Sequence, residues 1–312
     1  GYKSVSLTGA QVGIKTSKEY SNARIETIEG GRLMRELDAG NIVIVAGFQG
    51  ITDNGEITTL GRGGSDTTAV VLGEALSALS VEIYTDVDGI MTADPRIVPT
   101  ASILKHISYA DMFQIAEQGA KVIHPRAIEI AMRSNIPVII KNTMNNSEGT
   151  IISSNLISDT WNKTVEISDA VTSITHIPNR IQISIENIAL AAQNKLLSKF
   201  ADNGISIDLI NIFPNRLMFT IDDHNSESAK NILNNCEYSY SIIEGCSKVS
   251  VIGNKMRGLP GIMASIINAL VTKNIKILQT ADSHTTISCL VQTEDTIDAV
   301  LALHEEFKLS KR

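Results

Sequence analysis

The stretch TTLGRGGSDTT, residues 58–68, places three glycines immediately before a predicted helix. Glycine lets the backbone turn tightly and approach a ligand closely. The helix, predicted from Asp66 to Leu79, points its free N–H groups and the positive end of its dipole at the turn. We therefore expect an anion there, and Arg62 adds a planar guanidinium suited to a carboxylate or a phosphate.

Ser65 and Asp66 fall in the first turn of this helix, where two interpretations remain open. Taken singly, each is a common N-cap residue of an ordinary glycine-rich turn. Asp66 also brings a negative charge to the point where an anion is expected. The run of eleven residues as a whole favours a ligand-binding loop over a plain helix cap.

Outward from this loop, short apolar runs alternate with helical stretches over the first half of the chain. Three runs are nearly continuous, as strands covered on both faces must be: residues 41–46 (NIVIVA), 81–85 (VEIYT) and 137–141 (PVIIK). A second helix is predicted over residues 120–134. This order indicates an α/β fold with a mostly parallel open sheet, in which ligands bind at the carboxyl ends of the strands.

A second candidate loop spans residues 84–96 (YTDVDGIMTADPR) and follows one of these strands. Its hydroxyl, carboxylate and guanidinium groups suit the ribose, base and phosphates of a nucleotide. Asp86 and Asp88 also resemble the start of a calcium loop, but the later ligands of such a loop do not follow. The sequence therefore predicts a nucleotide loop and no protein-bound metal.

A third candidate segment is GAKVIHPRA, residues 119–127. Lys121 lies near a turn and could serve as a point charge for a phosphate. His124 precedes a proline, and a structural role is the favoured interpretation of its side chain. Arg126 is open between a salt bridge inside the domain and a place in the site.

These segments resemble the aspartokinases, which have the amino-acid kinase (carbamate kinase-like) fold. The resemblance extends along the whole chain and is closest to the diaminopimelate- and lysine-sensitive type of Gram-positive bacteria. It is carried by LGRGGSDTTA (60–69), YTDVDGIMTADPR (84–96) and GAKVIHPRA (119–127), with LTGAQ (7–11), NARI (22–25) and VAGFQG (45–50) in support.

The resemblance implies transfer of the γ-phosphoryl group of ATP, with Mg²⁺, to the β-carboxylate of L-aspartate. The product, 4-phospho-L-aspartate, begins lysine, threonine, methionine and diaminopimelate biosynthesis. Arg62 and Asp66 would be catalytic. The implied substrate-binding residues are Arg62, Gly63, Gly64, Ser65 and Asp66. The implied ATP-binding residues are Thr85, Asp86, Met91, Thr92, Asp94, Arg96 and Lys121, although many relatives have Tyr in place of Met91.

Two family motifs have no counterpart in these residues: an opening Lys-Phe-Gly-Gly-Thr-Ser segment and a later Ser-x-Gly-Glu segment. The chain starts at Gly1, just before a predicted strand at residues 5–8, so the kinase fold is expected to be incomplete at its N-terminus. The family's lysine neutralises charge on the transferring phosphoryl group, so this chain alone is expected to be inactive. The alternative function is a non-catalytic, amino-acid-binding regulatory subunit, against which the complete set of nucleotide loops argues.

The second half of the chain contains an internal repeat of about 70 residues. Residues 203–207 (NGISI) are echoed by residues 273–277 (KNIKI), each at the end of a predicted helix. The repeat indicates two copies of a small βαββ, ferredoxin-like module after a polar linker. The predicted division is a kinase domain at 1–152, a linker at 153–170, and two modules at 171–244 and 245–312.

The two modules resemble ACT domains, which bind regulatory amino acids. The resemblance implies that the first module is inserted within the second, so the strand at residues 171–177 would pair in the sheet of the second. The implied effector residues are Ser206, Ile207, Asp208, Met256, Gly261, Gln279, Thr280, Ser283 and His284. Asp208 suits the ammonium group of lysine, diaminopimelate or threonine, and a solvated carboxylate at a strand end is its open alternative.

Composition limits the partners of the protein. Its net charge is −7 and its basic residues are scattered, which argues against nucleic acid. Three widely spaced cysteines argue against a disulfide framework and fit a reducing cytoplasm. No apolar run reaches the roughly 18 residues needed to cross a membrane. Antiparallel edge strands in the modules favour pairing with a second copy, so a homodimer or higher oligomer is expected.

Overall fold

The structure is a computed structural model that describes residues 1–154, 167–236, 238–254, 256 and 258–311. The chain forms two compact units, the first comprising residues 1–90 and 103–161 and the second residues 91–102 and 162–312. The predicted linker at 153–170 lies largely outside the described residues, apart from its two ends. None of the helices in the described ranges is both long and apolar enough to cross a membrane.

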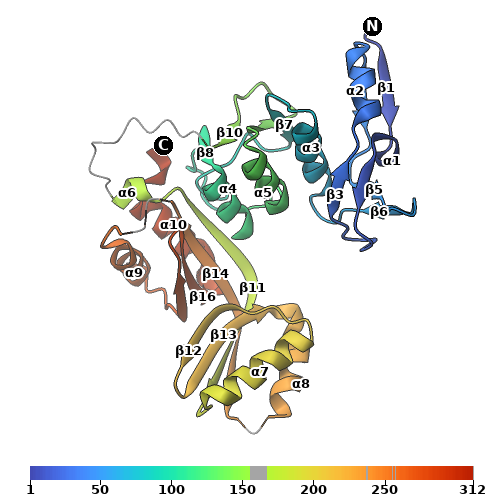
Figure 1. Ribbon diagram of the computed structural model, residues 1–312. Coiled ribbons are helices and arrows are strands. Elements are labelled where there is room, and N and C mark those ends of the chain that lie inside the picture. Colours follow the sequence, from blue (N-terminus) through green and yellow to red (C-terminus); the bar gives the residue numbers. More distant parts are fainter. Residues whose placement is uncertain (155–166, 237, 255, 257, 312) are drawn as a thin grey trace. The chain divides into compact units, whose positions relative to one another are not determined.

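The described part of the first unit contains ten strands and five helices. Figure 1 shows how they follow one another along the chain. The strands are β1 (Ser4–Leu7), β2 (Ile14–Thr16), β3 (Ile25–Ile28), β4 (Ile42–Val45), β5 (Gln49–Ile51), β6 (Ile57–Thr59), β7 (Val81–Thr85), β8 (His106–Ser108), β9 (Val138–Asn142) and β10 (Thr150–Ser153). The helices are α1 (Gly9–Val12), α2 (Gly31–Asp38), α3 (Gly64–Ala75), α4 (Tyr109–Glu117) and α5 (Pro125–Ser134).

These strands form three sheets, a parallel pair β1-β4 and two mixed sheets with the orders β3-β2-β5-β6 and β7-β9-β10-β8. The pairs β1/β4, β2/β5, β7/β9 and β8/β10 are parallel. The pairs β2/β3, β5/β6 and β9/β10 are antiparallel, because each joins strands that follow one another along the chain. Parallel pairing therefore dominates only slightly, and the α/β class holds.

Two predicted helix boundaries were wrong, for local reasons. Helix α3 ends at Ala75 and not at Leu79, because Ser77 adopts a positive φ of 48° that a helix cannot contain. Helix α5 begins at Pro125 and not at residue 120, because proline lacks an N–H group and is preorganised for the first helical position.

The prediction of strands covered on both faces was also wrong for residues 41–46 and for residues 81–85, where Tyr84 is 58% exposed. The side chains of Ile42 and Ile44 are 51% and 55% exposed. Val43 and Val45 instead pack against the core that contains Leu33 of helix α2. Among the described strands, β4 pairs with β1 alone, and helix α2 packs on the side that carries Val43 and Val45, so its alternate side chains face solvent.

The second unit contains one antiparallel sheet over its described residues, in the order β12-β13-β11-β14-β16-β15. Its strands are β11 (Ser173–Glu186), β12 (Asp208–Phe213), β13 (Arg216–Asp222), β14 (Tyr240–Ile252), β15 (Gln279–Asp282) and β16 (Thr286–Gln292). Its helices are α6 (Ile167–Ala170), α7 (Leu190–Asp202), α8 (Ser226–Asn234), α9 (Ile262–Thr272) and α10 (Thr296–Glu306). Each predicted βαββ copy is thus followed by a further helix, α8 or α10.

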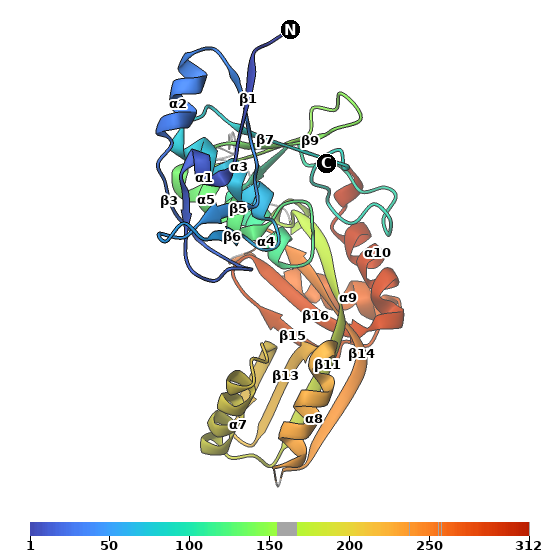
Figure 2. The ribbon, with the colours of Figure 1, turned by 90° about the vertical axis from the view of Figure 1, so that its right-hand side faces the viewer.

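Strands β11 and β14 run through both halves of the second unit (Figure 2). Residues 173–177 of β11 pair with residues 248–252 of β14, whereas residues 180–186 pair with β13. Helices α7 and α8 pack over the half that carries Ile181, and α9 and α10 pack over the half that carries Ile174. A strand that precedes the first module therefore lies in the sheet of the second, which agrees with the pairing expected for it.

Residues 91–102, here called the 91–102 loop, pack in the second unit. The sequence placed them in a kinase domain that runs continuously from residue 1 to 152. In the structure, Ala93 and Val98 are 5% and 2% exposed and belong to the core formed with α9 and α10. Local pattern could not reveal this placement, because hydrogen-bonding partners of the loop lie 82 and 212 positions away along the chain.

Candidate functional site

The glycine-rich loop at residues 61–64 is shaped by close contacts. Gly61 and Gly63 have φ angles of 74° and 65°, in the left-handed region that favours glycine. A Cβ atom on Gly63 would lie 2.1 Å from Cβ of His124, and one on Gly64 would lie 2.7 Å from Cδ2 of Phe48. A side chain at either glycine would therefore displace the segments that form the loop.

Helix α3 has Gly63 as its N-cap residue, and no side chain caps it. The interpretation of Ser65 or Asp66 as an N-cap was therefore wrong. Ser65 and Arg62 are exposed, and neither side chain has a hydrogen-bonding partner among the described residues. A guanidinium, a hydroxyl and the positive end of a helix are thus presented together at one surface, which suits an anionic ligand.

Asp66 is half-buried beside this surface. Its Oδ2 accepts a hydrogen bond of 3.3 Å from the backbone N–H of His124. Burial raises the pKa of the Asp66 carboxyl, and the hydrogen bond from His124 opposes that rise. No described residue binds Oδ1 of Asp66, so this oxygen is available to a cationic group.

His124 and Arg126, at the start of helix α5, contact the glycine-rich loop and the residue before it. The His124 ring caps helix α5 by accepting the N–H of Arg126 at Nδ1 (3.2 Å). The Arg126 guanidinium donates to the carbonyl oxygen of Leu60 (3.2 Å) and to Oδ1 of Asn22 (3.4 Å). His124 thus has the structural role favoured for it. Arg126 makes no ion pair with any described residue, and its contacts hold Leu60 and Asn22 next to the glycines.

A groove of about 1130 Å³ lies in the same unit and is lined in part by Thr67, His124 and Arg126. None of residues 61–66 lines it. Its size alone does not mark it as the site, because the polar groups that converge on an anion are those of the glycine-rich loop.

Three of the expected nucleotide residues lie in the first unit: Thr85, Asp86 and Lys121. Thr85 is at the carboxyl end of β7, and its hydroxyl donates to Oδ1 of Asp86 (3.1 Å). Asp86 and Lys121 are exposed. The structure places the first two side by side, while Lys121 precedes helix α5 on a separate segment.

Asp88 is held by two asparagine side chains. It accepts hydrogen bonds of 2.7 Å from the side-chain amides of Asn142 and Asn145. These two bonds lower the pKa of the Asp88 carboxyl, that from Asn145 contributing more. Asp88 thereby ties the turn after β7 to the segment after β9.

The other four expected nucleotide residues, Met91, Thr92, Asp94 and Arg96, lie on the 91–102 loop in the second unit. The Arg96 guanidinium grips both carboxylate oxygens of Asp94, with an Nη2 to Oδ2 distance of 2.6 Å, and holds the pKa of the Asp94 carboxyl low. The Arg96 side chain is 88% exposed. Thr92, by contrast, is fully buried.

Four of the nine effector candidates come together in the second unit. Met256, Gly261, Ser283 and His284 line a cavity of about 390 Å³. The cavity lies between the start of helix α9 and the turn that joins β15 to β16. The other five candidates do not line it.

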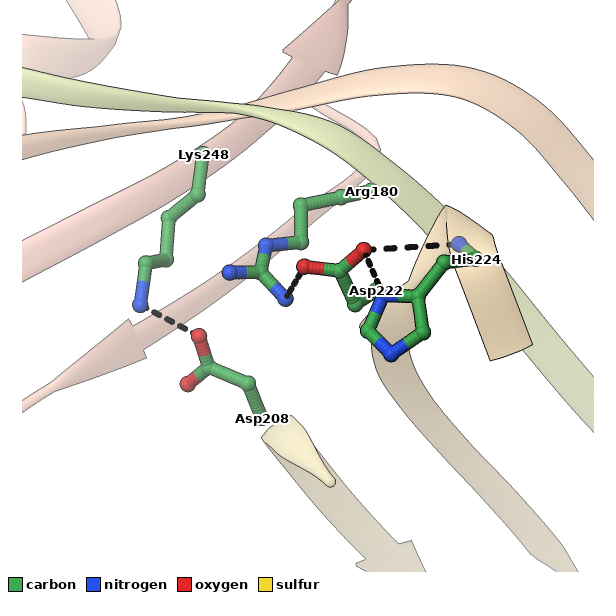
Figure 3. A network of polar contacts seen from close by, with 5 residues as sticks. All are labelled: Arg180, Asp208, Asp222, His224 and Lys248. Carbon is green, nitrogen blue, oxygen red and sulfur yellow. Dashed lines mark hydrogen bonds and ion pairs between the residues drawn. The ribbon is translucent and has the colours of Figure 1, made fainter. Parts of the chain in front are cut away.

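Asp208 lies on β12 and Gln279 on β15, the two edge strands of the sheet. The Gln279 amide donates to Oδ1 of Asn211 (2.6 Å) and to the carbonyl oxygen of Leu209. Asp208 pairs with the ammonium group of Lys248, whose side chain is only 6% exposed (Figure 3). Asp208 was expected either to bind the ammonium group of an effector or to be a solvated carboxylate. Neither describes it fully, because the carboxylate is partly exposed and is already paired with Lys248.

Ser206, Ile207 and Thr280 complete the predicted set. Ser206 is exposed, and Ile207 packs against the core of the first module. Thr280 lies on β15 and is half-buried. These three flank Asp208 and Gln279 along the chain, not the 390 Å³ cavity.

A cluster of titratable groups, Asp222, Asp223 and His224, lies at the end of β13. Figure 3 shows that Asp222 faces two partners. One carboxylate oxygen lies 3.4 Å from the Arg180 guanidinium, and the other lies 2.6 Å from Nδ1 of His224. Because its charge is compensated within the protein, we assign no ligand to this cluster.

Sequence reasoning missed several residues that shape these sites. The Thr68 hydroxyl accepts the N–H of Phe48 and so holds the segment that packs on Gly64. The position of Thr68, directly after the glycine-rich loop, could have marked it as part of the site. Lys248 and His304 gave no local signal, because a single charged or titratable residue in an apolar segment reveals nothing of its partner.

Comparisons with known proteins agree on one family. The model of the amino acid kinase family matches residues 1–142, and that of the ACT domain matches residues 241–305. Aspartokinase 1 of Bacillus subtilis (strain 168) is 42% identical over 313 residues, which cover 100% of this chain and 77% of that protein.

Solved structures give the same result. Aspartokinase III of E. coli in complex with aspartate and ADP (R-state) superposes with a TM-score of 0.77 at 27% identity, covering 98% of this chain and 70% of that chain. The same enzyme with lysine and aspartate (T-state) gives a TM-score of 0.76 at 28% identity, covering 97% and 69%.

Proposed function

Because this chain belongs to the aspartokinases of the amino acid kinase family, we propose that its glycine-rich loop is the place where aspartate is phosphorylated. An aspartokinase transfers the γ-phosphoryl group of ATP to the side-chain carboxylate of aspartate. The proposal is carried by two exposed side chains, Arg62 and Ser65, which have no hydrogen-bonding partner in the described part of the chain and lie at the start of helix α3, where no side chain caps the helix.

The chemistry requires two anions to be brought together. The aspartate carboxylate and the γ-phosphate repel each other, and negative charge spreads over the phosphoryl oxygens during transfer. Arg62 can bind two oxygens at once, and the helix start adds N–H groups that need no reorganisation. Gly63 and Gly64 let the loop that carries these groups pack against His124 and Phe48, because a Cβ atom at either glycine would clash with those residues.

Asp66 has a different role in this proposal. Its Oδ2 is held by His124, which leaves Oδ1 directed to a cation. The α-ammonium group of aspartate is such a cation. Arg62 and Asp66 would then grip opposite charges of one amino acid, which selects for a zwitterion and sets its orientation.

We propose that Thr85, Asp86, Met91, Asp94, Arg96 and Lys121 belong to the ATP site, with Thr92 in support. Exposed Lys121 and Arg96 supply positive charge for phosphates. Mg²⁺ would accompany ATP. The exposed carboxylate of Asp86 and the hydroxyl of Ser65 are the hard oxygen donors that Mg²⁺ prefers, and a nucleotide-bound Mg²⁺ needs few protein ligands.

For regulation, we propose that the 390 Å³ cavity of the ACT domain takes an amino acid. The E. coli enzyme binds lysine in its T-state, which supports lysine or diaminopimelate as the effector class, with threonine as a further candidate. His284 and Ser283 offer polar groups, and Met256 offers an adaptable apolar wall. A second position, at Asp208 and Gln279, would require the effector's ammonium to displace that of Lys248.

The domain boundaries, the oligomeric state and the location of the protein are also proposals. We propose a kinase domain at 1–152, with the 91–102 loop packed elsewhere, and ACT modules at 171–244 and 245–312. The exposed apolar side chains of edge strand β12, Ile210, Ile212 and Phe213, support pairing with a second copy. A cytoplasmic location fits three cysteines that form no disulfide within the described residues.

The test of the aspartate site is a coupled ADP-release assay on the full-length protein. Arg62→Ala should lower kcat/KM for aspartate at least about a hundredfold, as loss of a transition-state donor does. Arg62→Lys should recover only part, because an ammonium group cannot bind two oxygens in the guanidinium geometry. Lys105→Ala, which removes an exposed lysine elsewhere in the unit, is the matched control and should change nothing.

Aspartate must be the acceptor for the assignment to hold. Turnover with glutamate in place of aspartate, or an Arg62→Ala variant with wild-type kinetics, would exclude the proposed site.

For the effector cavity, lysine, diaminopimelate and threonine should each be tested by thermal shift, because a bound ligand stabilises the folded state by RT ln(1 + [L]/Kd). His284→Ala should abolish the shift, whereas an equal shift in both proteins would place the effector elsewhere.

A further inference from the structure

Thr92 uses every polar group it has inside the second unit. Its N–H donates to the carbonyl oxygen of Ser102 (3.0 Å), and its own carbonyl accepts the N–H of Ile174 (2.8 Å). Its hydroxyl oxygen accepts the N–H of Ser102 (3.0 Å) and lies 2.9 Å from Nε2 of His304. With an exposed fraction of 0%, Thr92 has neither a free group nor a free surface for a ligand.

His304 lies on helix α10 and is equally enclosed. Its exposed fraction is 2%, and burial lowers the pKa of its imidazole, so the ring is neutral at physiological pH. Helix α10 is the last helix of the region matched by the ACT domain model. The Thr92–His304 hydrogen bond therefore joins the loop that carries expected ATP residues to the regulatory domain.

The anchored part of the 91–102 loop is distinct from its exposed part. Ala93 and Val98 lie in the core, and the Thr100 hydroxyl accepts a hydrogen bond of 3.1 Å from Ser310. Between Ala93 and Val98, the side chain of Arg96 is 88% exposed. The loop thus has a buried base held by the second unit and an exposed tip that presents the charged groups.

We propose that Thr92 and His304 are positioning residues that hold the 91–102 loop in the conformation that binds ATP. This inference rests on the proposed role of the loop in nucleotide binding. Neither side chain contacts the nucleotide. Loss of their hydrogen bond lowers the fraction of molecules with a correctly placed tip, and the apparent affinity for ATP falls by that fraction.

The effect should be specific to ATP. Thr92→Val and His304→Leu remove one partner each at nearly constant volume, and each should raise KM for ATP about three- to tenfold in the full-length enzyme, with KM for aspartate unchanged. The double variant should bind ATP no more weakly than Thr92→Val alone, because Thr92→Val already removes the contact with His304, together with the one to the N–H of Ser102. His304→Gln should recover much of the affinity, since its amide can replace Nε2 as a hydrogen-bonding group.

Thr296→Val is the matched control. Thr296 is a buried threonine, as Thr92 is, and lies on helix α10, as His304 does. It is 6% exposed, and its hydroxyl has no partner among the described residues. This variant should leave both KM values unchanged. A rise in KM for ATP in Thr296→Val equal to that in His304→Leu would overturn the proposal, because general loosening of α10 would then explain the effect.

Arg96→Ala separates failure of this inference from failure of the proposed ATP site. If Arg96→Ala raises KM for ATP while Thr92→Val and His304→Leu do not, the loop binds ATP and the positioning proposal is wrong. If all three variants keep the wild-type KM, the role of the loop in ATP binding fails, and the positioning proposal fails with it. Additive effects of Thr92→Val and His304→Leu would also contradict it.

Discussion

Gly63 packs so closely against His124 that a Cβ atom at Gly63 would lie 2.1 Å from Cβ of His124. The two residues come from different segments, the glycine-rich loop and the start of helix α5. Their contact joins the loop that presents Arg62 to the segment whose N–H group holds Asp66. The absence of a side chain at Gly63 is therefore a condition for the geometry of the whole site.

Gly63→Ala should both destabilise the first unit and remove activity. The substitution combines a left-handed backbone, which costs a non-glycine residue about 1–2 kcal/mol, with a clash against His124. Thermal unfolding and kcat/KM would measure the two effects. Gly55→Ala is the control, because Gly55 has a φ of 82° but open space around it, so it should show the backbone cost and keep its activity. Equal losses in the two variants would contradict the importance of the His124 contact.

Asp66→Asn should stabilise the protein relative to wild type increasingly as the pH rises. Burial raises the pKa of Asp66 in the folded state above its value in the unfolded chain. The contribution of Asp66 to stability is therefore complete below the unfolded pKa, near 4, and is lost as the pH rises through the folded pKa. Asparagine does not titrate. Unfolding midpoints of both proteins at several pH values between 4 and 7 would test this, and a difference that stays constant with pH would contradict it.

The two halves of the Lys248–Asp208 ion pair should differ in their cost when removed. Asp208→Ala leaves an ammonium group whose side chain is 6% exposed, and should destabilise the second unit by about 3 kcal/mol. Lys248→Met leaves a carboxylate whose side chain is 38% exposed, and should cost about 1 kcal/mol.

Chemical denaturation of both variants would measure this asymmetry. Lys105→Met provides the comparison, because Lys105 and its partner Glu148 are 75% and 85% exposed, and its loss should cost less than about 1 kcal/mol. Equal costs for Asp208→Ala and Lys248→Met would show that solvent reaches Lys248 more easily than the structure indicates.

Cys289 should resist alkylation in the folded protein. Burial raises the pKa of its thiol to about 12, so almost no thiolate is present at pH 8. Cys236 is only partly buried and should react first with iodoacetamide, as peptide mapping by mass spectrometry would show. All three cysteines should react at similar rates in 6 M guanidinium chloride. Early labelling of Cys289 without denaturant would mean that the core beneath α9 and α10 opens readily.

The sequence predicted the elements whose signal is local. The strand at residues 81–85 and the glycine-rich loop before α3 were recognisable because apolar patterning and glycine reflect the conformation of the adjacent backbone. The family, the α/β fold with an ACT domain and the kinase activity are confirmed. The roles of individual site residues stay predictions, because the comparisons do not test them residue by residue.

Errors arose where a neighbour in space overrides the local pattern. The run NIVIVA looked like a strand buried on both faces, yet Ile42 and Ile44 face solvent. An apolar run does not show whether one layer of structure or two pack against the strand. The turn before Pro125 was assigned to a helix, because residues 120–123 are compatible with one until the proline fixes the helix start.

By itself, the sequence determined that a glycine-rich turn precedes helix α3 and that a βαββ module occurs twice, because backbone preferences and apolar periodicity act over a few neighbouring residues. Only the tertiary structure decided that the 91–102 loop packs with helix α10 through Thr92 and His304, which are 212 positions apart. It alone decided that Lys248 binds Asp208. Such partners depend on how the whole chain closes around its cores, and no local pattern of residues records that choice.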